Sequence, residues 1–318
     1  MFSYPSHPAP SLLLGLAIGD ALGVPVEFLS RKQVRANPVT DMSGWGTHDQ
    51  PPGTWSDDSS LAFCLAEALV EGYNLHAIAQ KFIRWKFEAY WTARNEVFDI
   101  GITTSNAIEQ LARAVPPGDA GGKSESSNGN GSLMRIVPLV FYLKDKPIAD
   151  RFAITRNVSA LTHGHIRSVI ACFYFVEYLR KILEGNRPLS AYHALQIEMT
   201  DFLNSMQIDA LEIQHFNRLL QGEIYKLKEE EIYSSGYVVH TLEASIWCLL
   251  TTENFVDAVL KAVNLGDDTD TTGAVTGAIA GLWYGLDDIP STWLNKLARK
   301  ADIKKLAKAL AKKQFNAA

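Results

Sequence analysis

Helical spacing of apolar residues recurs along almost the whole chain and limits the fold more than any other feature of the sequence. Apolar side chains stand three and four positions apart over residues 61–70, 75–90, 166–183, 191–203 and 255–263, which is the period of an amphipathic helix. Alternation of polar and apolar residues over five or more positions is scarce, so a sizeable β-sheet is not expected. The sequence therefore predicts an all-α fold.

The segments between these helices predict one domain rather than several. Stretches rich in Gly, Pro, Asn and Ser occur at residues 37–54, 116–130 and 185–188, and none resembles a linker between independent domains. With 318 residues and 47% apolar side chains, the chain can bury one large core. We therefore predict a single compact orthogonal helical domain over residues 1–318, with its core at 11–300 and its long loops converging at one end.

Composition excludes several classes of protein. The formal net charge of −5 argues against nucleic-acid binding, since such proteins usually carry a basic face. The three cysteines are isolated, so neither a disulfide scaffold nor a thiolate zinc site is expected. The apolar run at 12–18 has no Lys or Arg before it, unlike a secretory signal, and the uncharged segment 271–286 is shorter than a membrane span. We expect a cytoplasmic monomer without nucleic-acid or membrane partners.

Two acidic segments each precede an apolar helix. GTWSDDSS at 53–60 places two adjacent carboxylates between Ser56 and Ser59, although a helix cap needs only one acceptor. GDDTDTTG at 266–273 places three carboxylates within four residues, where they repel one another. Helix capping or a divalent cation explains each segment alone equally well. Together they offer enough oxygens for a two-metal site, for which Mg²⁺ or Mn²⁺ is suitable.

Two further segments carry chemistry. Glycines in NGNGS (128–132) allow backbone N–H groups to approach an anion, although a flexible turn explains them too. We expect a helix to follow from Leu133. His163 and His165 are two positions apart and do not share one helix face, which predicts a loop with one of the two rings lining a cleft.

Asp20 and Glu27 stand in an otherwise apolar segment, where a carboxylate is costly to bury unless it is paired or binds a cation. Taken in order, all these segments resemble the ADP-ribosylglycohydrolase family. The matching stretches are GLAIGDALGVPVEF (15–28), GTWSDDSSLAF (53–63), FDIG (98–101), GNGSLMRIVP (129–138), LTHGH (161–165), SSGYVVHTL (234–242), NLGDDTDTTGAVTGAIAGLWYG (264–285) and DDIPSTWL (287–294).

The resemblance implies an all-α fold with two divalent cations, Mg²⁺ or Mn²⁺, at the bottom of an ADP-ribose cleft. The metal ligands that it implies are Ser56, Asp57, Asp58, Asp268, Asp270 and Thr271. The catalytic carboxylates that it implies are Glu27 and Asp99. The substrate-binding residues that it implies are Gly129, Asn130, Gly131, Ser132, His163 and Tyr237. The implied partner is an ADP-ribosylated protein or a small ADP-ribose conjugate.

The chain departs from the family pattern at several positions. Ser56 and Ser59 stand where the first motif commonly has threonine, and Asp267 stands where the second motif often has glycine. Ile102 replaces an asparagine, and His240 an acid, of a bacterial member of the family. We expect the metal site to remain intact, whereas recognition of the modified side chain is affected most.

The implied reaction is metal-dependent hydrolysis of the bond between the anomeric carbon of ADP-ribose and its acceptor, with protein ADP-ribosylarginine as the first acceptor. Glu27 or Asp99 would act as the general base, and the N–H groups of a helix start at 129–132 would hold the diphosphate. Two alternatives stay open. One is a catalytically inactive ADP-ribose-binding or structural protein on this scaffold, and the other is a metal-dependent hydrolase of a nucleotide phosphoanhydride.

Overall fold

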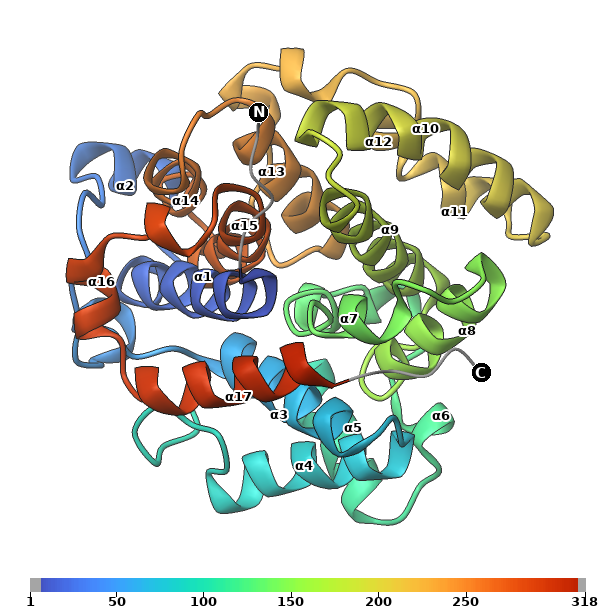
Figure 1. Cartoon of the computed structure of the whole chain (residues 1–318), viewed down its shortest axis with the longest axis horizontal. Coiled ribbons are helices and arrows are strands. Elements are labelled where there is room, and N and C mark those ends of the chain that lie inside the picture. The colour runs from blue at the N-terminus through green and yellow to red at the C-terminus, as the bar shows by residue number, and fades with distance from the viewer. Residues whose placement is uncertain (1–6, 314–318) are drawn as a thin grey trace.

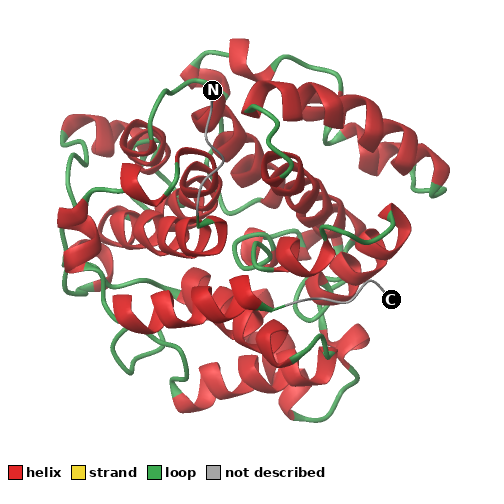
Figure 2. Ribbon diagram, viewed as in Figure 1, coloured by secondary structure: helices red, strands yellow, loops and turns green. Residues whose placement is uncertain are grey.

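The computed structural model describes residues 7–313, which form helices joined by turns and loops (Figure 1). The α-helices of the first half are α1 (Pro8–Gly23), α2 (Arg31–Ala36), α3 (Asp57–Glu71), α4 (Leu75–Glu88), α5 (Ile102–Ala112), α6 (Pro117–Ala120), α7 (Leu139–Leu143) and α8 (Ile148–Ser159). Those of the second half are α9 (Ile166–Leu183), α10 (Pro188–Ser205), α11 (Ala210–Gln214), α12 (Asn217–Leu220), α13 (Val238–Leu250), α14 (Phe255–Val263), α15 (Thr269–Tyr284), α16 (Ser291–Lys296) and α17 (Lys300–Lys312). The 3₁₀ turns are η1 (Val24–Val26), η2 (Gly46–His48), η3 (Glu125–Ser127), η4 (Asn130–Ser132), η5 (Ile224–Lys226), η6 (Glu229–Glu231) and η7 (Leu286–Asp288). No β-strand occurs in the described range, and the all-α prediction is confirmed (Figure 2).

All five segments with helical spacing are helices. Residues 166–183 and 255–263 coincide with α9 and α14. Helix α3 begins before its apolar spacing does, at Asp57, because the first turn of a helix carries capping residues rather than core residues. Helix α10 begins at Pro188, whose fixed φ suits a first turn. The predicted loop at 116–130 contains the short helix α6 and the turn η3.

One expected helix does not form. Residues 130–132 make the 3₁₀ turn η4, and non-helical turns follow until α7 begins at Leu139. Pro138 explains the difference, because proline removes a backbone donor and restricts the residue before it. Pro138 therefore leaves little more than one helical turn of chain for a helix that would start at Leu133. The predictions of a helix from Leu133 and of a helix start at 129–132 are therefore wrong.

Helices α1 and α15 lie next to each other (Figure 1) and are both almost wholly buried. They are antiparallel and in backbone contact. A Cβ atom on Gly15 would lie 2.2 Å from the carbonyl oxygen of Gly277, and one on Gly19 would lie 1.9 Å from that of Gly273. Any side chain at these glycines would push the helices apart. The close contact therefore holds the C-terminal end of α1 beside the N-terminal end of α15, where both carry carboxylates.

Further helices surround this pair. Helices α3 and α17 pack against α1, while α13 and α14 pack against α15. Helix α17 buries Ile303, Leu306 and Leu310 and leaves its lysines at the surface. Helix α9 contacts α13 and carries α8 and α10, which lie toward the outside of the molecule (Figure 1). The core is thus continuous from α17 to α10.

One helical stretch of the described residues, Pro8–Val26, is long and apolar enough to cross a membrane by length and composition. It consists of α1 and η1, and 94% of its most apolar window is buried inside the fold. Contact with α15, α17 and α3 accounts for its apolar composition.

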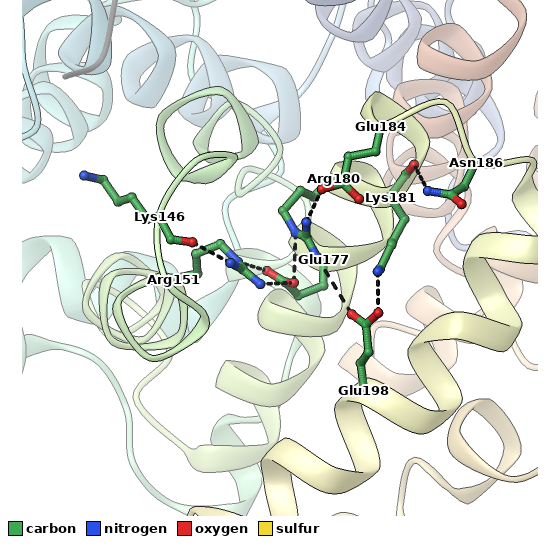
Figure 3. Close-up of polar contacts among 8 residues, drawn as sticks. All are labelled: Lys146, Arg151, Glu177, Arg180, Lys181, Glu184, Asn186 and Glu198. Carbon is green, nitrogen blue, oxygen red and sulfur yellow. Dashed lines mark hydrogen bonds and ion pairs between the residues drawn. The ribbon is translucent and has the colours of Figure 1, made fainter. Parts of the chain in front are cut away.

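A network of ion pairs joins the outer helices α8, α9 and α10 (Figure 3). Glu177 of α9 is 1% exposed and accepts two hydrogen bonds from the Arg151 guanidinium, at 2.6 and 2.7 Å. Its Oε2 also accepts a hydrogen bond from Arg180 at 3.1 Å. Arg180 and Lys181 extend the network to Glu198 of α10. Both oxygens of the buried carboxylate therefore have cationic partners.

Candidate active site

A cleft of about 660 Å³ is lined by residues from segments that lie far apart in the sequence. The sequence-predicted site residues that line it are Glu27, Asp57, Asp99, Gly129, Asn130, Gly131, His163, Asp268 and Thr271. Those buried next to these lining residues in the same motifs are Ser56, Asp58, Ser132 and Asp270. The fold thus brings together almost every residue that the sequence assigns to the site.

Asp20 ties the end of α1 to the start of α3. Its buried carboxylate accepts hydrogen bonds from the N–H of Ser56 at 2.8 Å, the N–H of Ser59 at 3.0 Å and the Ser59 hydroxyl at 2.5 Å. The Ser56 hydroxyl in turn accepts a hydrogen bond from the N–H of Asp58 at 3.3 Å. Burial raises the pKa of Asp20 to about 6, although these hydrogen bonds oppose the rise. The first turn of α3 therefore supplies the hydrogen-bond donors that the buried Asp20 carboxylate needs.

The two acidic segments meet at Thr271. Its hydroxyl donates to Asp58 Oδ1 at 3.2 Å, across 213 positions of sequence, and its N–H donates to Asp270 Oδ1 at 2.8 Å. Asn130 Nδ2 donates to Asp268 Oδ2 at 2.9 Å. Each of these acids therefore has one oxygen held by a donor, which orients the other oxygen.

Three carboxylate oxygens at this junction are buried and have no hydrogen-bond partner in the described part of the chain: Asp58 Oδ2, Asp268 Oδ1 and Asp270 Oδ2. Oxygens of Asp20, Asp58 and Asp270 lie within 4.8 Å of one another, and so do oxygens of Glu27, Asp268 and Asp270. Clustered carboxylate and hydroxyl oxygens are the ligands that hard divalent cations prefer. The residues present therefore fit the divalent cations that the sequence predicts.

Burial and mutual repulsion oppose ionisation of these acids. The pKa values of Asp57, Asp58 and Asp270 are raised well above their ordinary range, first by burial and then by neighbouring carboxylates. The same causes raise the pKa of Glu27 to about 11 and that of Asp99 to about 9. A cation beside them would favour the charged forms. Ionisation of this cluster and cation binding are therefore coupled.

His48 is a site residue that the sequence analysis missed. Its Nε2 forms a hydrogen bond with Glu27 Oε2 and lies 3.9 Å from Asp99 Oδ1. The neighbouring Thr47 hydroxyl donates to the Glu27 carbonyl at 2.7 Å, which fixes the loop against η1. A single histidine in a polar loop matches no motif, so the only signal was the length of the loop itself.

The glycine-rich segment is paired with the turn before α13. The N–H of Asn130 donates to the Gly236 carbonyl, and the N–H of Val238 donates to the Asn128 carbonyl, both at 3.0 Å. Gly131 lines the cleft and is partly exposed. The segment therefore presents its backbone to a ligand without being the start of an α-helix.

The two histidines of LTHGH have different roles. His163 is buried and lines the cleft, where a Cβ atom on Gly131 would lie 2.8 Å from its Cε1. His165 is the N-cap of α9 and accepts a hydrogen bond from the N–H of Arg167 at 3.2 Å. The predicted loop with one cleft-lining ring is confirmed.

Tyr237 lies at the margin of the site. Its ring lies 5.8 Å from the Arg167 guanidinium, and its hydroxyl lies 3.5 Å from His215 Nδ1. Its contact with a substrate stays a prediction.

Ile102 lines the cleft and is 81% exposed, whereas His240 packs edge-on against Tyr237 with ring centroids 5.0 Å apart. Of these two departures from the family pattern, Ile102 is the one that lines the cleft directly.

Comparison with known proteins decides the family. The model of the ADP-ribosylglycohydrolase family matches residues 9–317. The chain belongs to the ADP-ribosylglycohydrolase family. It is 36% identical to the ADP-ribosylarginine hydrolase Tri1 of Serratia proteamaculans, over 95% of this chain and 78% of the relative. It is 29% identical to the ADP-ribosyl-[dinitrogen reductase] glycohydrolase of Rhodospirillum rubrum, over 91% of this chain and 90% of the relative.

A solved structure supports the same conclusion. The ADP-ribosylglycohydrolase-related protein complex has a TM-score of 0.79 to this chain at 32% identity, over 96% of both chains. The fold and the family that the sequence motifs indicate are therefore confirmed. The chain is a glycohydrolase of the ADP-ribosylglycohydrolase family, whose members cleave glycosidic bonds of ADP-ribose.

Proposed function

We propose that the protein cleaves the bond between the anomeric carbon of ADP-ribose and an arginine side chain of a modified protein, with two divalent cations, Mg²⁺ or Mn²⁺. The observation that carries this proposal is the set of buried, unpaired oxygens of Asp58, Asp268 and Asp270. Relatives that are 36% and 34% identical bear the name ADP-ribosylarginine hydrolase, which supports arginine as the acceptor.

Asp270 supports the choice of two cations. It belongs to both groups of clustered oxygens, one with Asp20 and Asp58 and the other with Glu27 and Asp268. Together the two groups contain all three acids that have an unpaired buried oxygen, Asp58, Asp268 and Asp270, and these would hold the cations. The further ligands are Ser56, Asp57 and Thr271. When bound, such cations supply Lewis-acid polarisation and lower the pKa of a water molecule.

Glu27 and Asp99 are the groups placed to move a proton. His48 is hydrogen-bonded to Glu27 and lies 3.9 Å from Asp99, so it orients Glu27 and lies next to both carboxylates. Departure of the acceptor builds positive charge on the sugar ring, which ionised carboxylates stabilise. The same acidic wall suits a guanidinium acceptor, because that group is cationic and planar. Either carboxylate then takes the proton of the attacking water.

The diphosphate of the substrate binds at the glycine-rich segment, which Asn130 connects to Asp268 by a hydrogen bond of 2.9 Å. Residues 129–132 and His163 contact the diphosphate, and of these Gly129, Asn130, Gly131 and His163 line the cleft. Binding energy from this remote part holds the anomeric carbon in place for attack. The monomeric state and the cytoplasmic location stay predictions.

The test is mass spectrometry of products from ADP-ribosyl-arginine and ADP-ribosyl-serine peptides, with Mg²⁺, with Mn²⁺ and with EDTA. Free ADP-ribose released from the arginine peptide only in the presence of a metal supports the proposal. Release from the serine peptide alone contradicts the acceptor. AMP or phosphate as a product contradicts glycosidic cleavage, and binding of ADP-ribose without turnover contradicts catalysis.

A further inference from the structure

Arg135 is a buried cation next to the cleft. Its side chain is 0% exposed, and no carboxylate of the described residues forms an ion pair with it. The guanidinium lies 4.7 Å from the Phe82 ring centroid and donates to the Val158 carbonyl at 3.3 Å. A buried charge without a counter-charge is costly. Stability alone does not explain this arginine.

Thr162 connects Arg135 to His163. The Thr162 hydroxyl oxygen lies 2.7 Å from Arg135 Nη2 and 2.8 Å from His163 Nδ1, and all three side chains are buried. A guanidinium can only donate hydrogen bonds, so the hydroxyl oxygen accepts from Arg135. Within the described residues, the proton of that hydroxyl then has one acceptor, which is Nδ1 of His163.

This arrangement decides which nitrogen of the ring carries the proton. A proton on Nδ1 would leave the buried Thr162 hydroxyl without an acceptor, which is costly. Nδ1 therefore presents its lone pair, and the imidazole proton is on Nε2. Burial, together with the charge of Arg135, also lowers the pKa of His163 to about 3, so the ring is neutral at physiological pH.

The Nε2 edge of the ring lies against two glycines of the cleft. A Cβ atom on Gly129 would lie 3.4 Å from Nε2, and one on Gly131 would lie 3.5 Å from it. Both glycines and His163 line the cleft, and no hydrogen bond among the described residues uses Nε2. A side chain at either glycine would crowd this edge, whereas glycine leaves the Nε2 proton accessible to a ligand.

We propose that Arg135 is a positioning residue that acts through Thr162 and fixes His163 as the neutral tautomer whose Nε2–H donates a hydrogen bond to a diphosphate oxygen of the substrate. A neutral donor of this kind binds an anionic oxygen without taking up or releasing a proton. The identity of the ligand rests on the proposed function, but the tautomer does not.

The first test reads the tautomer by NMR in the ligand-free, full-length protein. Thr162→Val removes the hydroxyl at nearly constant shape, and Thr162→Ser is the matched control that keeps it. Long-range ¹H–¹⁵N spectra of histidine-labelled protein, assigned with a His163→Asn variant, report the proton position. We expect Nε2–H in the wild type and in Thr162→Ser, and loss of this single tautomer in Thr162→Val. A wild-type ring protonated on Nδ1, or an unchanged ring in Thr162→Val, overturns the proposal.

The second test measures ADP-ribose binding by calorimetry. We expect the Kd to rise about tenfold in Thr162→Val and to stay within about twofold in Thr162→Ser, since one hydrogen bond changes. Equal weakening in both variants contradicts the role of the hydroxyl. If ADP-ribose does not bind the wild type, the proposed function fails, while the NMR result still decides the tautomer. If circular dichroism shows that Thr162→Val is unfolded, Arg135→Met replaces it, because methionine cannot donate a hydrogen bond to Thr162, and the same NMR outcomes are decisive.

Discussion

Two clusters of buried charged side chains in this fold are balanced in opposite ways. The Glu177 carboxylate is bonded on both oxygens to Arg151 and Arg180 of the same fold (Figure 3). At the floor of the cleft, carboxylates from α1, α3 and α15 meet, and within the described residues none of them forms an ion pair with Lys or Arg. The charge of Glu177 is balanced by cationic side chains of the protein, whereas the carboxylates at the floor of the cleft need a bound cation to balance their charge.

This difference separates a structural use of buried charge from a functional one. Breaking a buried ion pair is costly because the remaining charge stays buried without a partner. Removing one member of an all-acidic cluster instead relieves repulsion and takes away a ligand. A cation that binds the folded cluster also stabilises the fold by mass action. The same kind of substitution should therefore act on stability in one place and on activity in the other.

The largest effect is expected from Asp268→Ala or Asp270→Ala. Each variant should lower kcat/KM on an ADP-ribosyl-arginine peptide by roughly a thousandfold or more, because each removes one of the buried unpaired carboxylate oxygens that would bind the cations. In the metal-free protein, the unfolding temperature should stay the same or rise, and added Mg²⁺ should no longer raise it. Near-wild-type turnover by the double variant would falsify the assignment of this site.

Glu177→Gln should show the opposite pattern. It leaves the buried Arg151 without a carboxylate partner, whereas Arg180 keeps Glu184 and Glu198, so the free energy of unfolding should fall by about 3–5 kcal/mol. The kcat/KM should stay within about twofold of the wild type, since these helices do not line the cleft. Glu198→Gln is the matched control. Its side chain is 42% exposed, so we expect a loss of less than about 1 kcal/mol in urea unfolding. Equal losses in both variants would contradict the comparison.

Glu243 is an intermediate case that stability against pH can test. Its buried carboxyl lies 3.4 Å from the partly exposed Arg218, and burial raises its pKa from 4.5 to about 7 although Arg218 opposes the rise. Between these two values the unfolded chain releases the proton and the folded chain keeps it. The folded state therefore binds more protons, and the contribution of Glu243 to the free energy of unfolding falls as pH rises.

Glu243→Gln removes this titration. The variant should match the wild type at pH 4 and exceed its free energy of unfolding by about 1–3 kcal/mol at pH 8. Denaturant unfolding at both pH values measures the difference. A variant that is less stable than the wild type at pH 8 would show that the Arg218 ion pair outweighs burial.

The smallest effect is expected at Asp267, an acid beside the cluster but exposed to solvent. Its φ of +61° is a conformation that glycine adopts at little cost. Asp267→Gly should raise the free energy of unfolding by up to about 1 kcal/mol and leave kcat/KM within about twofold. Asp267→Ala removes the charge but keeps Cβ, so it should give no such gain. An equal gain in both variants would assign the effect to charge instead of backbone strain.

The sequence alone determined the local features of this protein. Apolar spacing identified the long helices, and the order of the acidic and glycine-rich motifs identified the family, because both signals depend on residues close together in the chain. Predictions from the sequence failed where the local signal was incomplete. The helix expected from Leu133 fails because of Pro138, and no local pattern marks His48 or the capping of α3 by Asp20.

Tertiary structure decided which acids meet and what each one contacts. Asp58 and Thr271 are 213 positions apart and become neighbours because α1 holds both of their helices: its Asp20 binds the start of α3, and its glycines contact the backbone of α15. Spacing along a helix cannot show such a contact, since it depends on the packing of whole elements. The same holds for the Arg135–Thr162–His163 chain, whose proton positions follow from burial and hydrogen-bond geometry that exist only in the folded protein.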